Sequence, residues 1–375
     1  MEFFETKQAA AILKHAILKR YLHPYAMKTG TNSLNRRVAF VDGYAGEGRY
    51  VDGKEGSPAL AMLTARNLAG HRQLECTFVE ADPTAFARLT SVVQAEAGAC
   101  VVATIAGDIS DHLDDILTRV NGIPVFIFLD PFGLMIPFTA VAKIFKRPGT
   151  IGAPATEVLI NFNASGLRRI AGLLTSDKEN PGRDASLARM DEVCGGTWWR
   201  EQWLQHGDDR VAAEEAVIRQ YARMIFAATR CGFWITHVKR RQGHRPVYYL
   251  ILLTRHRDGL HLFGEVASKG LEEWRRAVLE VELKGTLFSV EDTFKDQEAA
   301  LEARWIAEIY ENLARLLGED KPFRVIDRYS EVYGSATGQA RQTHLRKAWK
   351  QVHKDGLTKT DSTGDPLSGK WIEPA

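Results

Sequence analysis

A strand that runs directly into a glycine-rich loop constrains this chain most. Residues 38–48 read Val-Ala-Phe-Val-Asp-Gly-Tyr-Ala-Gly-Glu-Gly, an apolar run that ends on Asp42 and opens into Gly43, Gly46 and Gly48. Glycines let a backbone turn sharply and lie close to a ligand, and doubly wound sheets hold ligands at the carboxyl ends of their strands. The stretch therefore predicts the ligand-binding edge of an α/β fold.

The order of these glycines bears on which ligand is bound. A dinucleotide-binding loop reads Gly-x-Gly-x-x-Gly and leads directly into a helix. This loop reads Gly-x-x-Gly-x-Gly and continues to Gly56 before Ser57-Pro58 begin the next helix. Aspartate followed by this glycine order favours S-adenosylmethionine as the cofactor.

Strand-like and helix-like segments alternate five times before residue 163. Strands are expected near residues 38–42, 75–80, 101–105, 124–129 and 157–162. Amphipathic helices are expected before and between them, at 7–22, 58–69, 83–97, 109–120 and 137–146. Continuously apolar strands separated by helices predict a parallel sheet that is covered on both faces.

The last part of this sheet is predicted to contain an antiparallel strand. A helix at 211–229 precedes two β-type runs at 233–238 and 247–253, which predict an antiparallel hairpin. A parallel sheet finished by such a hairpin is the arrangement of class I methyltransferases. The predicted fold class is therefore α/β, with a Rossmann-like class I methyltransferase sheet.

Three parts are predicted along the chain. Residues 1–270 form the methyltransferase-like domain, with 163–207 as an insertion near the active face, and residues 271–318 form a helical connector. Residues 319–375 form a winged-helix-like α+β domain, because helices at 324–333 and 339–354 precede a hairpin at 357–372.

The second helix of this C-terminal domain is strongly basic. It carries no acidic residue and five basic ones: Arg341, Arg346, Lys347, Lys350 and Lys354. One interpretation is a recognition helix that binds nucleic acid. The other is a solvated face on a domain that dimerises or docks a protein.

Acidic residues follow the ends of four successive strands. In a parallel sheet Asp42, Glu80, Asp108 and Asp130 should converge at one edge, although they lie far apart in sequence. Glu80 would then accept hydrogen bonds from two ribose hydroxyls, and Asp108 one from an adenine amino group. The methionine end of the ligand would be held by Asp42 and the loop residues Gly43, Tyr44, Ala45, Gly46 and Gly48. An acid in such a position also serves as a helix cap, and this alternative applies most to Asp108.

The fourth strand end carries the candidate catalytic residues, Asp130, Pro131 and Phe132. Asp130-Pro131-Phe132-Gly133 resembles the [Asp/Asn]-Pro-Pro-[Tyr/Phe] signature of enzymes that methylate exocyclic or amide-type nitrogens. There the acid accepts a hydrogen bond from the amine and the ring stacks on a base, so that the nitrogen lone pair points at the methyl group. This chain has only one proline, and a plain strand-to-helix turn is the alternative.

Together these motifs resemble the bacterial three-Cys-motif partner (TcmP) family over about residues 10–270. The resemblance implies a class I fold that binds S-adenosylmethionine, and a separate partner protein with a cysteine motif of radical-SAM type. Many relatives have Ala-Gly-Pro-Gly where this chain has Ala45-Gly46-Glu47-Gly48, so Glu47 faces either the ligand's ammonium or solvent. Neither a substrate nor the C-terminal domain is explained by the family. The matching motifs are Lys14-His15, Ile17-Leu18, Tyr21-Leu22, Phe40-Val41-Asp42-Gly43-Tyr44-Ala45-Gly46-Glu47-Gly48-Arg49-Tyr50, Gly56-Ser57-Pro58, Phe78-Val79-Glu80-Ala81-Asp82-Pro83, Phe128-Leu129-Asp130-Pro131-Phe132-Gly133 and Leu159-Ile160-Asn161-Phe162.

Composition narrows the class of protein further. No run approaches 18 apolar residues and the start lacks a basic-then-apolar signal, so we expect a cytoplasmic protein with no membrane partner. The four cysteines form no Cys-x-x-Cys pair, so neither a disulfide framework nor a metal site is expected. With 49 basic and 47 acidic residues, any surface that binds a polyanion must be local.

Two further groups have open interpretations. Lys239, Arg240, Arg241 and Arg245 lie at the tip of the predicted hairpin, either as a solvated turn or as a contact to nucleic acid. Trp198, Trp199 and Trp203 either stack on a base or form the core of the insertion.

The predicted function is methyl transfer from S-adenosylmethionine to a nitrogen of a nucleic-acid base. One alternative is a non-catalytic methyltransferase-like scaffold that binds nucleic acid and recruits a partner protein. Another is a methyltransferase that acts on a small molecule or protein of a partner radical-SAM system.

Overall fold

The computed structural model describes residues 2–50, 53–131, 133, 136–147, 154–176, 181–241, 243–364 and 366–375, with side chains from Ile12 onward. The chain divides into two compact units, Leu18–Gly259 and Met1–Ile17 with Leu260–Ala375. Helices α1 (Glu2–Thr29) and α10 (Arg257–Glu282) have residues in both. The domain bounds expected from the sequence stay a prediction.

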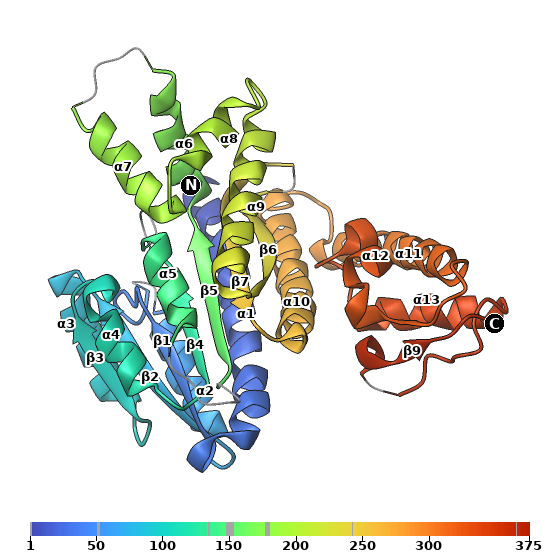
Figure 1. The fold of residues 1–375 in the computed structure, drawn as a ribbon, viewed down its shortest axis with the longest axis horizontal. Coiled ribbons are helices and arrows are strands. Elements are labelled where there is room, and N and C mark those ends of the chain that lie inside the picture. Colours follow the sequence, from blue (N-terminus) through green and yellow to red (C-terminus); the bar gives the residue numbers. More distant parts are fainter. Residues whose placement is uncertain are drawn as a thin grey trace. The chain divides into compact units, whose positions relative to one another are not determined.

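A seven-stranded sheet forms the centre of the first unit (Figure 1). Its order is β3-β2-β1-β4-β5-β7-β6, in which β1 to β5 are parallel and β7 runs antiparallel between β5 and β6. This is the arrangement predicted from the sequence, a parallel sheet finished by an antiparallel hairpin. The strands are β1 (Arg37–Asp42), β2 (Gln73–Glu80), β3 (Val102–Ala106), β4 (Val125–Leu129), β5 (Thr156–Phe162), β6 (Gly232–Lys239) and β7 (Pro246–Thr254).

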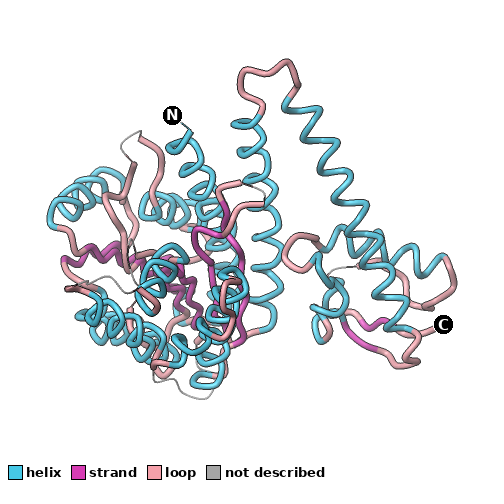
Figure 2. The backbone as a smooth tube through the Cα atoms, turned by 90° about the horizontal axis from the view of Figure 1, so that it is seen from above, coloured by secondary structure: helices cyan, strands magenta, loops and turns pink. Residues whose placement is uncertain are grey.

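Helices cover both faces of this sheet, as the strands and surrounding helices of Figure 2 show. One face packs into a continuous core with six helices, and alternate strand residues such as Val125, Ile127 and Leu129 point into it. On the opposite face, Phe126 contacts Tyr21 and Tyr25 of α1. The helices of the first face are α4 (Ile109–Arg119), α5 (Phe138–Phe145), α6 (Ala164–Ala171), α7 (Arg183–Cys194), α8 (Trp198–Leu204) and α9 (Arg210–Thr229).

Two further helices, α2 (Ser57–Leu68) and α3 (Pro83–Glu96), follow β1 and β2. Both begin with a proline in the first turn, where its missing N–H costs nothing. Asp82 caps α3, because its side chain accepts a hydrogen bond from the backbone N–H of Ala85 at 2.8 Å. The predicted starts of these helices agree with the structure.

The insertion forms α6, α7 and α8, which lie at the carboxyl end of β5 (Figure 1). Trp199 and Trp203 are buried in the same core as the sheet, and Trp198 packs against it. These tryptophans are therefore part of the core, the second of the two interpretations left open by the sequence.

Helix α1 is longer than the helix predicted at 7–22 and contains Pro24. Tyr25 and Ala26 beyond that proline are buried. The packing of these two side chains stabilises the helix beyond Pro24, although a proline ordinarily ends a helix.

The second unit contains α11 (Val290–Leu317), β8 (Phe323–Arg324), α12 (Tyr329–Tyr333), α13 (Gln342–Lys354) and β9 (Trp371–Ile372). The helix predicted at 324–333 is wrong in its first half, because β8 is followed by a 3-10 turn at Val325–Asp327. β-branched side chains lower the propensity for α-helix, and Val325 and Ile326 lie in this turn. Helix α13 starts three residues later than predicted, because Arg341 at its N-cap is still extended, with φ −118 and ψ 171.

The hairpin predicted at 357–372 is formed only in part among the described residues. β9 pairs antiparallel with β8, and a further antiparallel bridge joins Thr358 to Pro374. The core of this unit consists of residues from α11, α12, α13 and the two short strands, including Trp305, Tyr333 and Trp349.

Candidate active site

The parallel pairing brings the four predicted acids to one edge of the sheet. Asp42 and Glu80 are the last residues of β1 and β2, while Asp108 and Asp130 follow β3 and β4 within two residues. Strand β1 lies between β2 and β4. The glycine loop after β1 therefore has Glu80 on one side and Asp130 on the other.

Backbone hydrogen bonds tie this loop to both neighbouring strands. The N–H of Gly43 donates to the carbonyl of Phe128 at 2.9 Å, and the N–H of Ala45 to that of Val79 at 2.9 Å. The N–H of Gly46 donates to Glu80 Oε2 at 2.7 Å. The loop is thus fixed across the ends of β2 and β4 through its backbone N–H groups.

Glycine is required at two loop positions for different reasons. A Cβ on Gly43 would lie 2.6 Å from Ile109 Cδ1 and 2.9 Å from Leu129 Cδ2, so a side chain would clash with the core. Gly46 adopts φ +60, where side chains are strained, and nothing described lies within 4 Å of its Cβ position. Space beside Gly46 remains for a ligand.

Asp42 stabilises the loop through a side-chain hydrogen bond. Its side chain is fully buried, and Oδ1 accepts a hydrogen bond from the N–H of Tyr44 at 3.1 Å. Burial and the nearby Asp108 carboxylate raise the pKa of Tyr44, while Arg189 lowers it. Helix α7, which carries Arg189, therefore comes close to the loop.

Glu80 and Asp108 both bind backbone N–H groups. Glu80 Oε1 accepts from Asp82 N at 2.8 Å, so that each of its oxygens has one bond, and its side chain is partly exposed. Asp108 is exposed, and its Oδ1 accepts from Ser110 N at 2.7 Å, which makes it the N-cap of α4. Glu47 forms an ion pair with Arg88 at 2.7 Å.

Two asparagines hold the turn after β4, a role that the sequence analysis missed. Asn161 at the end of β5 donates from Nδ2 to Asp130 Oδ1 at 2.5 Å. Asn163 caps α6 by accepting from Gly166 N at 2.9 Å, and its Nδ2 lies 3.5 Å from the carbonyl of Gly133. Pro131 is buried, and Phe132 lies outside the described residues. The only sequence signal for this arrangement was a polar residue at the end of a neighbouring strand.

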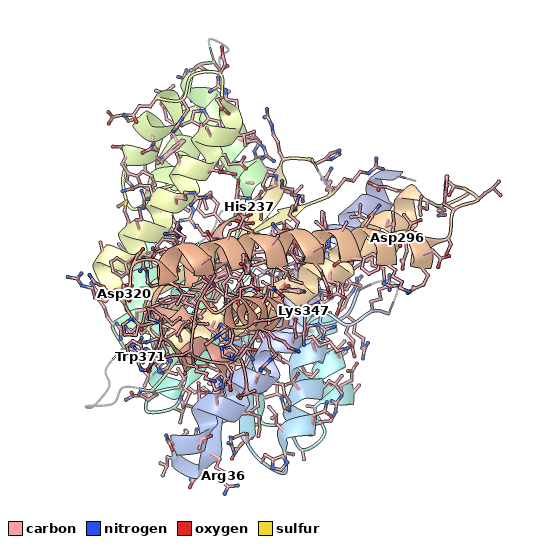
Figure 3. All side chains as sticks on the ribbon, turned by 90° about the vertical axis from the view of Figure 1, so that its right-hand side faces the viewer. Arg36, His237, Asp296, Asp320, Lys347 and Trp371 are labelled. Atoms are coloured by element: carbon pink, nitrogen blue, oxygen red, sulfur yellow. The ribbon has the colours of Figure 1, made fainter. Side chains whose placement is uncertain are left out.

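The five basic residues of the C-terminal unit do not all lie on an open surface. Arg341 pairs with Glu272 of α10 at 2.5 Å, and Lys347, labelled in Figure 3, pairs with Glu302 of α11 at 3.2 Å. Arg346 donates to the carbonyls of Ser362 and Gly364. Lys350 and Lys354 are exposed on the outer side of α13.

No helix in the described part of the chain is long and apolar enough to cross a membrane. Among the described residues, no group of three or more His, Cys, Asp and Glu side chains could hold a metal ion.

Comparisons with known proteins give only distant likenesses. No protein-family model and no curated protein matches the sequence. Among solved structures, an O-methyltransferase from Bacillus cereus in complex with SAH is 12% identical, with 67% of this chain and 90% of that chain covered and a TM-score of 0.33. The plantazolicin methyltransferase BamL, in complex with a triazolic desmethylPZN analog and SAH, is 12% identical, with 67% and 88% covered and a TM-score of 0.30. The cyclopropane synthase MmaA2 from Mycobacterium tuberculosis is 10% identical, with 62% and 81% covered and a TM-score of 0.26.

Proposed function

We propose that this chain transfers a methyl group from S-adenosylmethionine to a nitrogen of a nucleic-acid base. One observation carries the proposal. Glu80 ends β2 and Asp130 directly follows β4, the two strands that flank β1, and the glycine loop between them is bonded to Glu80. A ligand-binding carboxylate and an acceptor-binding carboxylate are thus available on the two sides of one loop.

The residues present fit the proposed cofactor. Each oxygen of Glu80 accepts one backbone hydrogen bond, and a carboxylate oxygen has two lone pairs, so Glu80 retains capacity for two ribose hydroxyls. Asp108 would hold the adenine amino group beside its capping bond, and the loop at residues 43–48 would hold the methionine end. When bound, S-adenosylmethionine supplies an electrophilic methyl group on a sulfonium.

Asp130 would orient the methyl acceptor. A carboxylate beside a primary amine accepts an N–H bond, which fixes the direction of the nitrogen lone pair. In-line methyl transfer needs this orientation and exclusion of water more than it needs a strong base. The bond from Asn161 to Asp130 Oδ1 supports this role, because it fixes the rotamer of the carboxylate.

Nucleic acid is the proposed acceptor because of the C-terminal unit. The order of helix α11, strand β8, helices α12 and α13 and strand β9 supports a winged-helix-like domain. Its α13 presents Lys350 and Lys354 at a helical spacing of four, on its exposed side. Such a pair of lysines suits contacts to phosphates.

One observation favours a second candidate function. Arg341, Arg346 and Lys347 are all engaged within their own unit, as expected of a scaffold that docks a protein. The partner would then be the cysteine-motif protein of radical-SAM type that the family resemblance implies. Either a non-catalytic scaffold or a methyltransferase acting on a small molecule or protein of that system would fit.

Calorimetric titration tests the cofactor first. We expect S-adenosylmethionine and S-adenosylhomocysteine to bind and NAD and ATP not to bind. Glu80→Ala should weaken binding by about 10- to 100-fold, the loss expected for hydrogen bonds to a charged group. Asp115→Ala, a change of an exposed acid on α4, should leave binding unchanged. Failure of the wild-type protein to bind either ligand would refute the proposal.

A labelled methyl donor tests the acceptor. Tritiated S-adenosylmethionine should label total bacterial RNA or DNA, and Asp130→Ala should abolish this labelling without weakening S-adenosylhomocysteine binding. Equal labelling by Asp130→Ala would refute the role of Asp130. Labelling confined to protein or small molecules would favour the second candidate function.

A further inference from the structure

The turn between β6 and β7 concentrates positive charge at the same edge of the sheet as Asp130. Residues 239–245, which we call the basic turn, contain Lys239, Arg240, Arg241, His244 and Arg245, with Gln242 outside the described residues. We propose that the basic turn binds the phosphate backbone of a single-stranded nucleic acid and so delivers a base to the site. This inference deepens the proposed function and rests on it for the identity of the site.

Strand pairing places the basic turn at the same edge as Asp130. β7 runs antiparallel to β5 and β6 antiparallel to β7, so β6 ends on the side where β5 ends. Tyr249 pairs with Phe162, the last residue of β5, whereas β7 begins at Pro246. At about 3.4 Å per residue, the hairpin extends roughly 10 Å beyond β5. The basic turn therefore projects past the strand that carries Asn161.

The base of the hairpin is anchored. Arg168 of α6 donates to the carbonyl of Pro246 at 3.0 Å and to Glu214 Oε2 at 2.5 Å. Tyr249 donates to Glu214 Oε1 at 2.7 Å. Glu214 is 2% exposed. Its charge is thus balanced locally by Arg168, and the turn starts from a rigid support. His237, labelled in Figure 3, lies two residues before the turn and faces Glu215 at 3.8 Å.

The charge of the basic turn is a local feature. Lys239, Arg240, Arg241 and Arg245 carry four permanent positive charges within seven residues of a chain whose net charge is only +2. His244 and Arg245 are exposed, and Lys239, Arg240 and Arg241 are partly exposed. Guanidinium groups match phosphate oxygens in bidentate geometry, which favours an arginine-rich turn as a phosphate contact.

A single strand is the form that this arrangement suits. An amino group inside a duplex is stacked and paired, so enzymes that modify bases act on single strands or flip the base out. A turn about 10 Å beyond β5 would hold the backbone while an unstacked base reaches the edge. Acidic proteins also bind basic turns, so the test includes an acidic peptide.

Fluorescence anisotropy with the full-length protein tests this inference. The probes are fluorescein-labelled 20-nucleotide dT and U single strands and a labelled poly-glutamate peptide of equal charge, each titrated from 50 to 300 mM NaCl. The variant carries Arg240→Glu, Arg241→Glu and Arg245→Glu. At 100 mM NaCl we expect it to bind the single strands at least tenfold more weakly than wild type. The slope of log K against log salt should fall by about 2, since each phosphate contact on a single strand contributes about 0.7.

The matched control carries Lys28→Glu, Arg119→Glu and Lys146→Glu. These exposed residues lie at or just beyond the carboxyl ends of α1, α4 and α5, at the opposite edge of the sheet, and give the same change in net charge. It should bind the single strands within threefold of wild type. Binding of S-adenosylhomocysteine should be equal in all three proteins, which shows that the variants are folded.

Each outcome decides between the two proposals. No single-strand binding at 50 mM NaCl, unchanged binding by the variant, or equally tight binding of poly-glutamate would overturn the role of the basic turn. If the wild-type protein did not bind S-adenosylhomocysteine, the proposed methyl donor would be overturned instead. Binding of single strands by the basic turn would then still be valid as a separate result.

Discussion

Asn161 donates its side-chain amide to Asp130, with 2.5 Å between Nδ2 and Oδ1. Asp130 directly follows β4 and Asn161 is the last residue but one of β5, the neighbouring strand, in which Ile160 pairs with Leu129 of β4. Asn161 is 8% exposed and Asp130 is partly exposed, so the bond is partly shielded from water. The amide therefore fixes the carboxylate that would orient the methyl acceptor.

We predict that Asn161→Ala lowers methyl transfer by about 10- to 100-fold, because a loosely held catalytic group loses its orientation. The measurement is turnover with tritiated S-adenosylmethionine, and the affinity for S-adenosylhomocysteine should stay within twofold of wild type. A loss of cofactor affinity equal to the loss of turnover would show that Asn161 serves only the fold.

Asn161→Asp tests in another way whether residue 161 positions Asp130 or only packs in the fold. Two adjacent carboxylates repel each other, so the pKa of one of them rises. The fall in activity at acidic pH should then begin at a higher pH than in wild type. If the fall in activity at acidic pH began at the same pH as in wild type, this would argue against contact between residue 161 and Asp130.

The glycine loop leads to a prediction about stability. Gly43→Ala should lower the free energy of unfolding by about 1–3 kcal/mol, the usual cost of overpacking a core, because its Cβ would meet Ile109 and Leu129. Urea denaturation measures the change. Gly70→Ala is the control, since none of the described residues has an atom within 4 Å of that Cβ position. Equal stability of the two variants would mean that the loop shifts without cost.

Local patterns in the sequence predicted the sheet well. The five apolar strands, the glycine loop and the hairpin each carry their signal within a few adjacent residues, as at 38–48. The bond between Asn161 and Asp130 could not be predicted, because it depends on which strands become neighbours. The pairing of β8 with β9 was missed because strands of two residues are too short to show a period.

The ion pairs of α13 could not be predicted from the sequence either. A basic stripe looks the same in sequence whether it faces solvent or the acids of α10 and α11. Glu272 and Glu302 lie 69 and 45 residues from their partners Arg341 and Lys347. Composition alone therefore overstated how many of the five basic residues are available to a ligand.

Charge reversal on α13 tests what remains of that stripe. Lys350→Glu with Lys354→Glu should weaken binding of a 20-base-pair DNA duplex and reduce the salt slope by about 2, if both lysines contact phosphates. Lys347 is left unchanged because it pairs with Glu302. The control is Lys295→Glu with Arg304→Glu, two exposed positions on α11. Equal affinities for the two double variants would favour the protein-docking candidate.

A buried acid at the other end of β5 should make the stability of the protein depend on pH. Glu157 is 3% exposed, and it accepts hydrogen bonds from Tyr21 at 2.6 Å and Thr254 at 2.8 Å. Burial outweighs these two bonds and raises the pKa of Glu157 from 4.5 to about 7. The folded state therefore holds a proton between these pH values that the unfolded state has already lost.

Stability should consequently fall as pH rises from about 4.5 to 7, by on the order of 3 kcal/mol from this residue. Below pH 4.5 both states are protonated and the contribution is fully present; above pH 7 it is lost. Urea denaturation at pH 5 and pH 8 measures the difference, which should shrink in Glu157→Gln because glutamine does not titrate. Glu75→Gln, a change in an acid on β2 that pairs with Arg37 near the surface, should retain the wild-type trend. An undiminished difference in Glu157→Gln would assign the pH dependence to other groups.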